Sequence, residues 1–263
     1  MIREFFKPSS IEEAIKLKDR HKDNAGWFGN GTFINNGSFE FHHETVIHLE
    51  NLNLTDIKET PDTITIGASV TLQELMDSDS APQVLKEAAL HETSRHIRNM
   101  RTLGGDIGIG TVYSNTIPCL VALSACVKTC DAILLLEEYL INKNSLILEI
   151  IIPKSDRICR LKKVSLQSNS PTIFTAAVSM EKDKKIVEKM IIALGGIKAA
   201  PIRLVTLEND LVKGLVNPTD TTAIKKAVAS NLNLVSDING STEYKKYIAG
   251  ISVADCITRC FQV

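Results

Sequence analysis

The hydrophobic positions near the N-terminus recur at the spacing of a helix. Ile11, Ala14 and Ile15 stand at positions i, i+3 and i+4, so they share one helix face. Ser10 and Glu13 form the pattern of a capping box, in which the serine oxygen accepts the Glu13 amide and the glutamate accepts the Ser10 amide. The pattern predicts a helix that begins after Ser10 and packs its apolar stripe on the strand that follows.

Short strands and helices alternate through the first half of the chain. Runs rich in β-branched residues predict strands over residues 25–28, 45–49, 63–68, 132–136 and 146–152. Helices are predicted after a second capping box at Thr71 and Glu74, over residues 81–93, and over residues 117–127, with Pro118 in the first turn. We expect these helices to cover a sheet.

The order of the elements changes after Pro153. This proline and the polar residues 154–157 interrupt an apolar strand, which is typical of a domain boundary. Strands are then predicted over residues 159–164, 172–180 and 186–194, and helices from Pro201, Pro218 and Thr242. Strands followed by helices indicate an α+β fold. The sequence therefore predicts two domains, residues 1–155 and 156–263.

The composition is that of a folded globular protein. The 263 residues are 44% hydrophobic and 23% charged, which excludes fibrous and disordered classes. The 30 basic and 31 acidic residues leave a net charge of −1, so binding to nucleic acid is not expected. No apolar run approaches the roughly 20 residues of a membrane span, and the first residues do not resemble a signal peptide. We expect a cytoplasmic protein without a membrane partner.

The histidines and cysteines do not form a recognisable metal site. His43 and His48, like His91 and His96, are five positions apart, one more than in the zinc-protease motif. On a helix the two rings of such a pair diverge by about 140°. The six cysteines include no Cys-x-x-Cys pair. We therefore expect free, buried thiols and no bound metal.

Two glycine-rich segments are candidate ligand loops. Gly29-Asn30-Gly31-Thr32 follows a predicted strand, where backbone amides can bind a phosphate, but it lacks the third glycine of a Rossmann loop and the lysine of a Walker loop. The segment from Arg101 to Gly110 holds four glycines in seven residues, with Thr102 and Asp106 as hydrogen-bonding side chains. Taken alone, the first segment is also compatible with a tight turn and the second with a flexible loop.

Taken together, motifs along the whole chain resemble a known family. They are Phe6-Lys7-Pro8 with the capped helix, the loop Gly29 to Thr32, and the segments SRHIRNMRTLGGD (94–106), LGGIKAAPIR (194–203) and DINGSTEYKK (237–246). In their order and spacing they are similar to the FAD-binding medium subunit of molybdenum hydroxylases, which includes xanthine dehydrogenase and carbon monoxide dehydrogenase flavoproteins. Within that family the chain most resembles the flavin subunit of xanthine-dehydrogenase-like enzymes, including those named as selenate reductases.

The resemblance implies a fold and a set of cofactor-binding residues. The fold is a two-lobed FAD-binding region of the vanillyl-alcohol-oxidase (PCMH) type, with lobes of about 1–56 and 57–155, followed by a smaller α+β domain of the CO dehydrogenase flavoprotein type. The two glycine segments wrap the pyrophosphate and ribityl chain, Leu148 touches the isoalloxazine, and Lys162 or Lys163 lies near its polar edge. The implied FAD-binding residues are Trp27, Phe28, Gly29, Asn30, Gly31, Thr32, Phe33, Ile34, Arg98, Thr102, Leu103, Gly104, Gly105, Asp106, Ser114, Asn115, Leu148, Lys162 and Lys163.

The resemblance also implies an electron-transfer function. Electrons would pass from a molybdopterin subunit to an iron–sulfur (2Fe-2S) subunit and then to FAD. FAD would pass them to NAD⁺ or another acceptor. Because the flavin carries the chemistry, no catalytic side chain is expected in this chain. No cysteine spacing typical of a ferredoxin is present, so the clusters are expected in another polypeptide.

Three departures from the family pattern keep alternatives open. Asn30 stands where the first loop usually has a glycine, and Asn115 stands where an aspartate near the ribityl hydroxyls is common. Leu166 and Gln167 replace paired arginines that many relatives carry near the nicotinamide entrance, which bears on the use of NAD. The first alternative is a flavin-free structural or assembly subunit. The second, a self-sufficient FAD oxidase, would need a substrate domain with its own acid/base pair.

Overall fold

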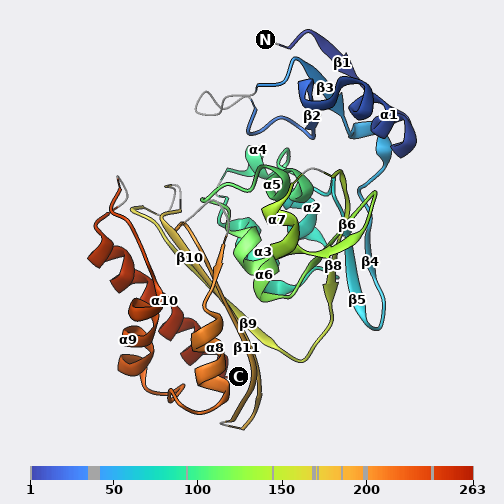
Figure 1. Ribbon diagram of the computed structural model, residues 1–263. Helices are drawn as coiled ribbons and strands as arrows, with labels where there is room; N and C mark the ends of the chain where they lie inside the picture. Colours follow the sequence, from blue (N-terminus) through green and yellow to red (C-terminus); the bar gives the residue numbers. More distant parts are fainter. Residues whose placement is uncertain are drawn as a thin grey trace.

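Over residues 2–34, 42–92, 94–143, 145–167, 170, 172–184, 186–197, 201–237 and 240–262, which the computed structural model describes, the chain forms three β-sheets (Figure 1). Each sheet carries its own helices. The first sheet lies at the N-terminal end of the molecule, the second in the middle, and the third runs alongside the second.

The first sheet is parallel, with the strand order β1-β3-β2, and α1 covers one face. Its elements are β1 (Glu4–Phe6), α1 (Ile11–His21), a 3-10 turn (Lys22–Asn24), β2 (Ala25–Phe28) and β3 (Thr45–His48), with a second 3-10 turn (Glu50–Leu52) after it. Ala14 of the predicted apolar stripe is fully buried against Ala25 and Ile47. The prediction that α1 packs on the following strand is therefore confirmed.

The two predicted capping boxes have different outcomes. At Thr71 both reciprocal bonds are present, since the Glu74 amide donates to Thr71 Oγ1 at 3.2 Å and the Thr71 amide donates to Glu74 Oε2 at 2.8 Å. At Ser10 only the first half is correct, with the Glu13 amide 3.2 Å from Ser10 Oγ. The Glu13 carboxylate accepts from the amide and the hydroxyl of Ser9 instead, because that residue offers it two donors.

The second sheet is antiparallel, with the order β4-β5-β8-β6-β7. Its strands are β4 (Ile57–Glu59), β5 (Thr63–Gly67), β6 (Cys126–Thr129), β7 (Ile133–Leu135) and β8 (Ile147–Pro153). Its helices are α2 (Leu72–Asp77), α3 (Gln83–Leu90), α4 (Arg95–Arg98), α5 (Leu103–Ile109), α6 (Thr116–Ala122) and α7 (Leu136–Ile141). Ile66, Leu85 and Ile150 belong to the core between this sheet and its helices.

Two of the predicted helices in this region are shorter than expected. The helix predicted over residues 117–127 ends at Ala122, because Ser124 takes a left-handed conformation (φ +57°) and the Ala125 amide donates to the Leu120 carbonyl at 2.9 Å. Val127 then pairs with Ile150 in the sheet. The helix predicted over residues 81–93 spans Gln83–Leu90, and Thr93 lies outside the described residues.

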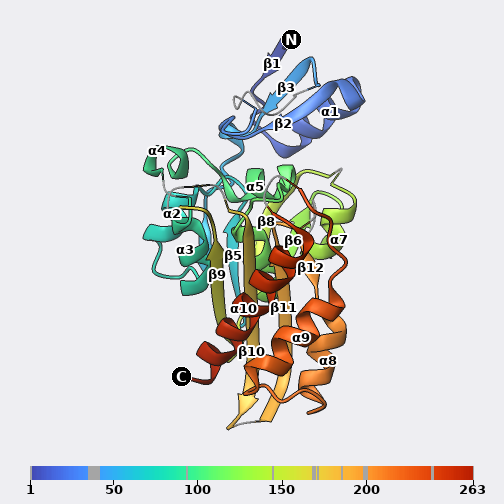
Figure 2. The ribbon, with the colours of Figure 1, turned by 90° about the vertical axis from the view of Figure 1, so that its left-hand side faces the viewer.

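The third sheet is antiparallel, with the order β12-β11-β10-β9, and both of its faces are covered (Figure 2). Its elements are β9 (Ile158–Val164), β10 (Phe174–Asp183), β11 (Ile186–Gly195), β12 (Ile202–Arg203), α8 (Val205–Val212), α9 (Thr221–Asn231) and α10 (Thr242–Phe261). The helix expected from Pro201 begins at Val205, because Ile202 and Arg203 pair with β11 first.

Strand β10 packs the third sheet against the second lobe, which contains the second sheet and its helices. Its residues alternate between two cores, with Val178 and Met180 packed with α10 and Ala177 packed with the core of the second lobe. Ser179 Oγ donates to the carbonyl of Ala122 in α6 at 2.6 Å. The side chains that face α6 are small, so the helix can approach the strand closely.

Candidate functional site

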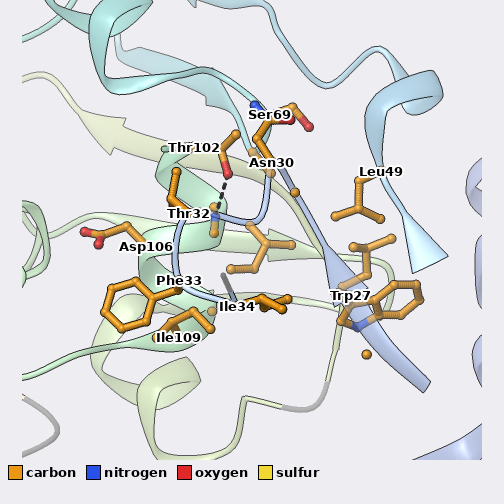
Figure 3. A pocket seen from close by; sticks show the side chains of 18 of the residues that line it. Trp27, Asn30, Thr32, Phe33, Ile34, Leu49, Ser69, Thr102, Asp106 and Ile109 are labelled. Carbon is orange, nitrogen blue, oxygen red and sulfur yellow. Dashed lines mark hydrogen bonds between the residues drawn. The ribbon is translucent and has the colours of Figure 1, made fainter. Parts of the chain in front are cut away.

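The two glycine segments line one cavity of about 320 Å³, which we call the first cavity (Figure 3). Gly31 comes from the loop after β2 in the first lobe, and Gly104 comes from the start of α5 in the second. Figure 3 shows Asp106 and Phe33 at one end of this cavity and Trp27 and Leu49 at the other. Two segments about seventy residues apart in the sequence therefore form a single site.

Backbone geometry at the loops depends on glycine. Gly31 has a φ of +71°, so the left-handed position of the first loop falls on this glycine, and Asn30 does not need to adopt it. A Cβ atom on Gly104 would lie 2.7 Å from both Cβ and the carbonyl oxygen of Ala68, so α5 packs directly on the end of β5. Thr102 caps α5 by accepting the Gly105 amide at 3.1 Å.

Asp106 has a buried oxygen without a partner. The side chain is 4% exposed, and its Oδ2 atom accepts from Ser114 Oγ at 2.6 Å and from Thr116 Oγ1 at 2.5 Å. Its Oδ1 atom is buried and has no hydrogen-bond partner among the described residues. Buried carboxylate oxygens are nearly always hydrogen-bonded, so this atom fits a ligand hydroxyl in the cavity that Asp106 lines.

A second cavity of about 240 Å³ adjoins the first. Phe33, Arg101 and Asp106 line both cavities and therefore mark their junction. The second cavity lies between the second lobe and the third sheet, and its polar lining residues are His91, Glu92, Thr111, Tyr113, Ser114, Asn115, Thr116, Lys163, Ser170 and Thr172.

His91 and Lys163 form a polar pair in the second cavity. Lys163 Nζ donates to the His91 carbonyl at 3.4 Å, and burial lowers the pKa of Lys163. Burial, together with the Lys163 charge, lowers the pKa of His91 to about 4. The His91 imidazole is therefore neutral at pH 7, and its buried Nε2 atom has no hydrogen-bond partner among the described residues.

Most of the residues expected to bind FAD reach one of the two cavities. Those in the first are Trp27, Gly29, Asn30, Gly31, Thr32, Phe33, Ile34, Thr102, Gly104, Gly105 and Asp106, and those added by the second are Ser114, Asn115 and Lys163. Alternation along β9 separates the two lysines, because Lys163 lines the second cavity while Lys162 forms an ion pair with Asp255 of α10 at 3.6 Å.

Four further expected residues do not line either cavity. Leu103 is fully buried in the core of the second lobe, and Leu148 packs with the core of the first. Phe28 contacts the His48 ring at 5.2 Å between centroids. Arg98 instead fixes the chain before the second loop, since its Nε donates to Gln73 Oε1 at 3.0 Å and its guanidinium donates to the Glu92 carbonyl at 2.7 Å.

Asn115 lines the second cavity, but its side-chain oxygen forms hydrogen bonds with residues of the third-sheet region. Its Oδ1 atom accepts from Thr172 Oγ1 at 3.0 Å and from Thr175 Oγ1 at 2.7 Å. The Asn115 oxygen, which the resemblance places near the ribityl hydroxyls, therefore already accepts two hydrogen bonds, whereas Asp106 Oδ1 has no partner among the described residues.

Several residues at the site were not expected from the sequence. Arg101, Ser69, Lys143, His91 and Glu92 line the cavities. Arg101 directly precedes the second loop, and this adjacency is a signal that could have identified it. Lys143 lies in a segment without a motif, so only the tertiary structure brings it to the site. Among the described residues, no group of three or more His, Cys, Asp or Glu side chains could hold a metal ion.

Two lobes that present glycine loops and an unpartnered carboxylate oxygen to one cavity are typical of a protein that binds a phosphate-bearing cofactor. Residues 1–155 match the family described as "FAD binding domain in molybdopterin dehydrogenase", and residues 160–260 match "CO dehydrogenase flavoprotein C-terminal domain". The chain belongs to this flavoprotein family, and its cofactor is FAD. The expected α+β fold and the resemblance to the medium subunit are confirmed.

The chain is similar to known proteins over its full length. It is 35% identical to the uncharacterized protein YgfM of Escherichia coli (strain K12), over 100% of this chain and 98% of that one. It is 25% identical to the nicotine 6-hydroxylase medium subunit of Paenarthrobacter nicotinovorans, over 90% of each chain. A chain of the carbon monoxide dehydrogenase structure from Hydrogenophaga pseudoflava has the same fold, with a TM-score of 0.88, 22% identity, and coverage of 100% and 98%.

Proposed function

We propose that this chain is the electron-transfer subunit of a molybdenum hydroxylase complex of the xanthine-dehydrogenase-like type. It would receive electrons from an iron–sulfur subunit and pass them through FAD to NAD⁺ or another acceptor. The observation that carries the proposal is that both glycine loops, one from each lobe, line the same cavity. A bound flavin supplies the ability to exchange electrons singly or in pairs.

We assign the residues of the two cavities to parts of FAD by their chemistry. Backbone amides of the loops at Gly29 to Thr32 and Thr102 to Gly105 would bind the pyrophosphate. Asp106 Oδ1 would accept a ribityl hydroxyl. Lys163 and the neutral His91 would donate to the polar edge of the isoalloxazine in the second cavity. These residues bind and orient the cofactor, and none of them is required to transfer a proton.

The placement of the cysteines supports a separate iron–sulfur partner. Among the described residues, no group of three or more Cys, His, Asp or Glu side chains is gathered to hold a metal ion, and a cluster needs four such ligands. The relative from Paenarthrobacter nicotinovorans is itself named as a medium subunit.

The domain limits and the binding residues belong to the same proposal. We assign residues 1–155 to the FAD-binding region, with lobes meeting near residue 56, and residues 156–263 to the C-terminal domain. The support is that the third sheet begins at Ile158 and that the first two sheets hold the two loops. No helix in the described part of the chain has both the length and the apolar character needed to cross a membrane.

Titration of the full-length apoprotein with FAD tests the proposal. We expect one FAD per chain, quenched flavin fluorescence, and a higher melting temperature with the cofactor bound. Addition of NADH with an artificial dye then tests the acceptor, since dye reduction requires the bound flavin to react with the nicotinamide. A chain that stays colourless and whose melting temperature does not respond to FAD would support the flavin-free alternative and contradict the proposal.

A further inference from the structure

Arg101 lies at the junction of the two cavities and is held there by its backbone. Its amide donates to the Ile97 carbonyl at 2.7 Å, and its carbonyl accepts from the Leu72 amide at 2.9 Å. The following residue, Thr102, forms an isolated bridge with Thr71. The backbone of Arg101 is therefore fixed at the wall that the two cavities share.

The side chain of Arg101 is held on two sides and has a buried donor without a hydrogen-bond partner among the described residues. One of its terminal nitrogens lies 2.9 Å from Glu92 Oε2, and its guanidinium carbon lies 5.5 Å from the centre of the Phe33 ring. The side chain is only 22% exposed. Its Nε atom is buried and has no hydrogen-bond partner among the described residues. A buried guanidinium donor is costly when it makes no bond, so its place in a cavity indicates a ligand acceptor.

The charge of the first cavity also points to Arg101. The charged side chains that line it within the described part of the chain are Arg101, Lys143 and Asp106, with His43 as a further titratable group. Lys143 lies past the C-terminal end of α5, where its Nζ donates to the Ile109 carbonyl at 3.1 Å. A diphosphate carries two negative charges, and among the described residues Arg101 is the cation that lines both cavities and directly precedes the second loop.

We propose that Arg101 is a positioning residue that binds the diphosphate of FAD at the junction between the cavities. The proposal rests on the FAD binding proposed above. Glu92 binds one terminal nitrogen of the guanidinium and Phe33 lies against the group, so the side chain is already ordered before FAD binds. A planar guanidinium can bind a carboxylate on one edge and a phosphate oxygen on another, whereas a lysine ammonium is a point charge without this division.

The test compares FAD binding by the full-length wild-type chain and three variants. We expect Arg101→Gln to raise the Kd for FAD at least tenfold, because it removes both the positive charge and the Nε–H donor. Arg101→Lys should recover part of the loss, since it restores the charge without Nε. The matched control is Arg95→Gln, which removes the same charge from an exposed position on α4 and should leave the Kd unchanged.

Salt dependence separates diphosphate binding from a structural role. If Arg101 pairs with the diphosphate, the dependence of log Kd on log salt should be shallower for Arg101→Gln than for the wild type. The melting temperature of each apoprotein shows whether a variant is simply less stable. Equal Kd values for the wild type and Arg101→Gln, or a reduced affinity with an unchanged salt slope, would overturn the inference. A wild-type chain that fails to bind FAD would contradict the proposed function instead.

Discussion

Three side chains of the second cavity each have a buried polar atom without a partner among the described residues. They are the Nε donor of Arg101, the Oδ1 acceptor of Asp106 and the Nε2 atom of His91. Unpartnered buried atoms are rare in folded proteins, and a cluster of them indicates a site where a ligand completes the hydrogen bonds. A cofactor with phosphate, hydroxyl and carbonyl groups offers a partner to each of the three atoms.

Replacement of Asp106 tests this interpretation at the residue scale. In Asp106→Ala, Ser114 and Thr116 lose their acceptor and FAD loses a partner for a ribityl hydroxyl. We expect the free energy of unfolding of the apoprotein to fall by about 1–3 kcal/mol, and the Kd for FAD to rise. Urea unfolding and FAD titration measure the two effects. Asp79→Ala, at an exposed position, should change neither, and an unaltered Kd in Asp106→Ala would contradict the assignment.

His91 predicts a pH dependence of stability. Its pKa falls from 6.5 to about 4 on folding, so between these values the unfolded chain binds a proton that the folded chain does not. The stabilisation is therefore complete above pH 6.5 and is lost as the pH falls towards 4. Allowing for its partial exposure, we expect this loss to be on the order of 1–2 kcal/mol.

Urea unfolding at pH 7.5 and pH 4.5 measures this effect. The difference in unfolding free energy between the two pH values should be smaller in His91→Gln than in the wild type. His96→Gln, which removes an exposed histidine nearby, should keep the wild-type difference. Identical pH profiles for His91→Gln and the wild type would show that His91 titrates normally in the folded protein.

At the scale of single elements, helix α5 and its N-cap contribute more residues to the lining of the first cavity than any other helix in the described part of the chain. Thr102 is the N-cap of α5 and Asp106 lies in its first turn. Of its glycines, Gly104 is closely packed and Gly108 is not. Gly104 faces Ala68, whereas a Cβ atom on Gly108 would meet nothing within 4 Å. The same substitution at these two positions therefore has opposite expected effects on stability.

Gly104→Ala and Gly108→Ala form a matched pair for this helix. The first would place a Cβ atom 2.7 Å from Ala68 and push α5 away from β5, at a cost of about 1–3 kcal/mol. The second meets no atoms and should stabilise the helix by about 0.5–1 kcal/mol. Thermal unfolding of the apoproteins measures both. A Gly104→Ala variant as stable as the wild type would show that α5 can shift without cost.

Local signals predicted most of these elements. The Thr71 capping box, the spacing of Ile11 and Ala14, and the break after Pro153 act within a few residues, so they were visible in the sequence. The errors occurred where distant contacts decide the outcome. The helix predicted to reach residue 127 ends at Ala122, where Ser124 turns the chain so that Val127 can pair with Ile150 in the sheet.

At the scale of the whole molecule, Asn115 connects the FAD-binding lobes to the third sheet. It stands between Ser114 and Thr116, which bind Asp106, and its own oxygen binds Thr172 and Thr175. Side chains of three consecutive residues therefore form hydrogen bonds in opposite directions, to Asp106 on one side and to Thr172 and to Thr175 of β10 on the other. The two parts of the chain also share a core through the small residues of this strand.

Asn115→Ala tests this connection. It leaves the hydroxyls of Thr172 and Thr175 without their acceptor, and we expect a loss of about 1–3 kcal/mol in the free energy of unfolding. Thr175→Val removes one of the same bonds, so the two substitutions should be non-additive in the double variant. Urea unfolding of the single and double variants measures the coupling. Strictly additive losses would mean that the two residues stabilise the protein independently.

The sequence by itself determined the order of the elements, the two glycine loops and the resemblance to the flavoprotein family, because these depend on spacing and composition along the chain. The tertiary structure decided which side chains meet. It selected Lys163 over Lys162 for the second cavity, turned the Asn115 oxygen to β10, and brought Arg101 to the junction beside Phe33. These outcomes depend on strand register and on packing between distant segments, which a local pattern does not encode.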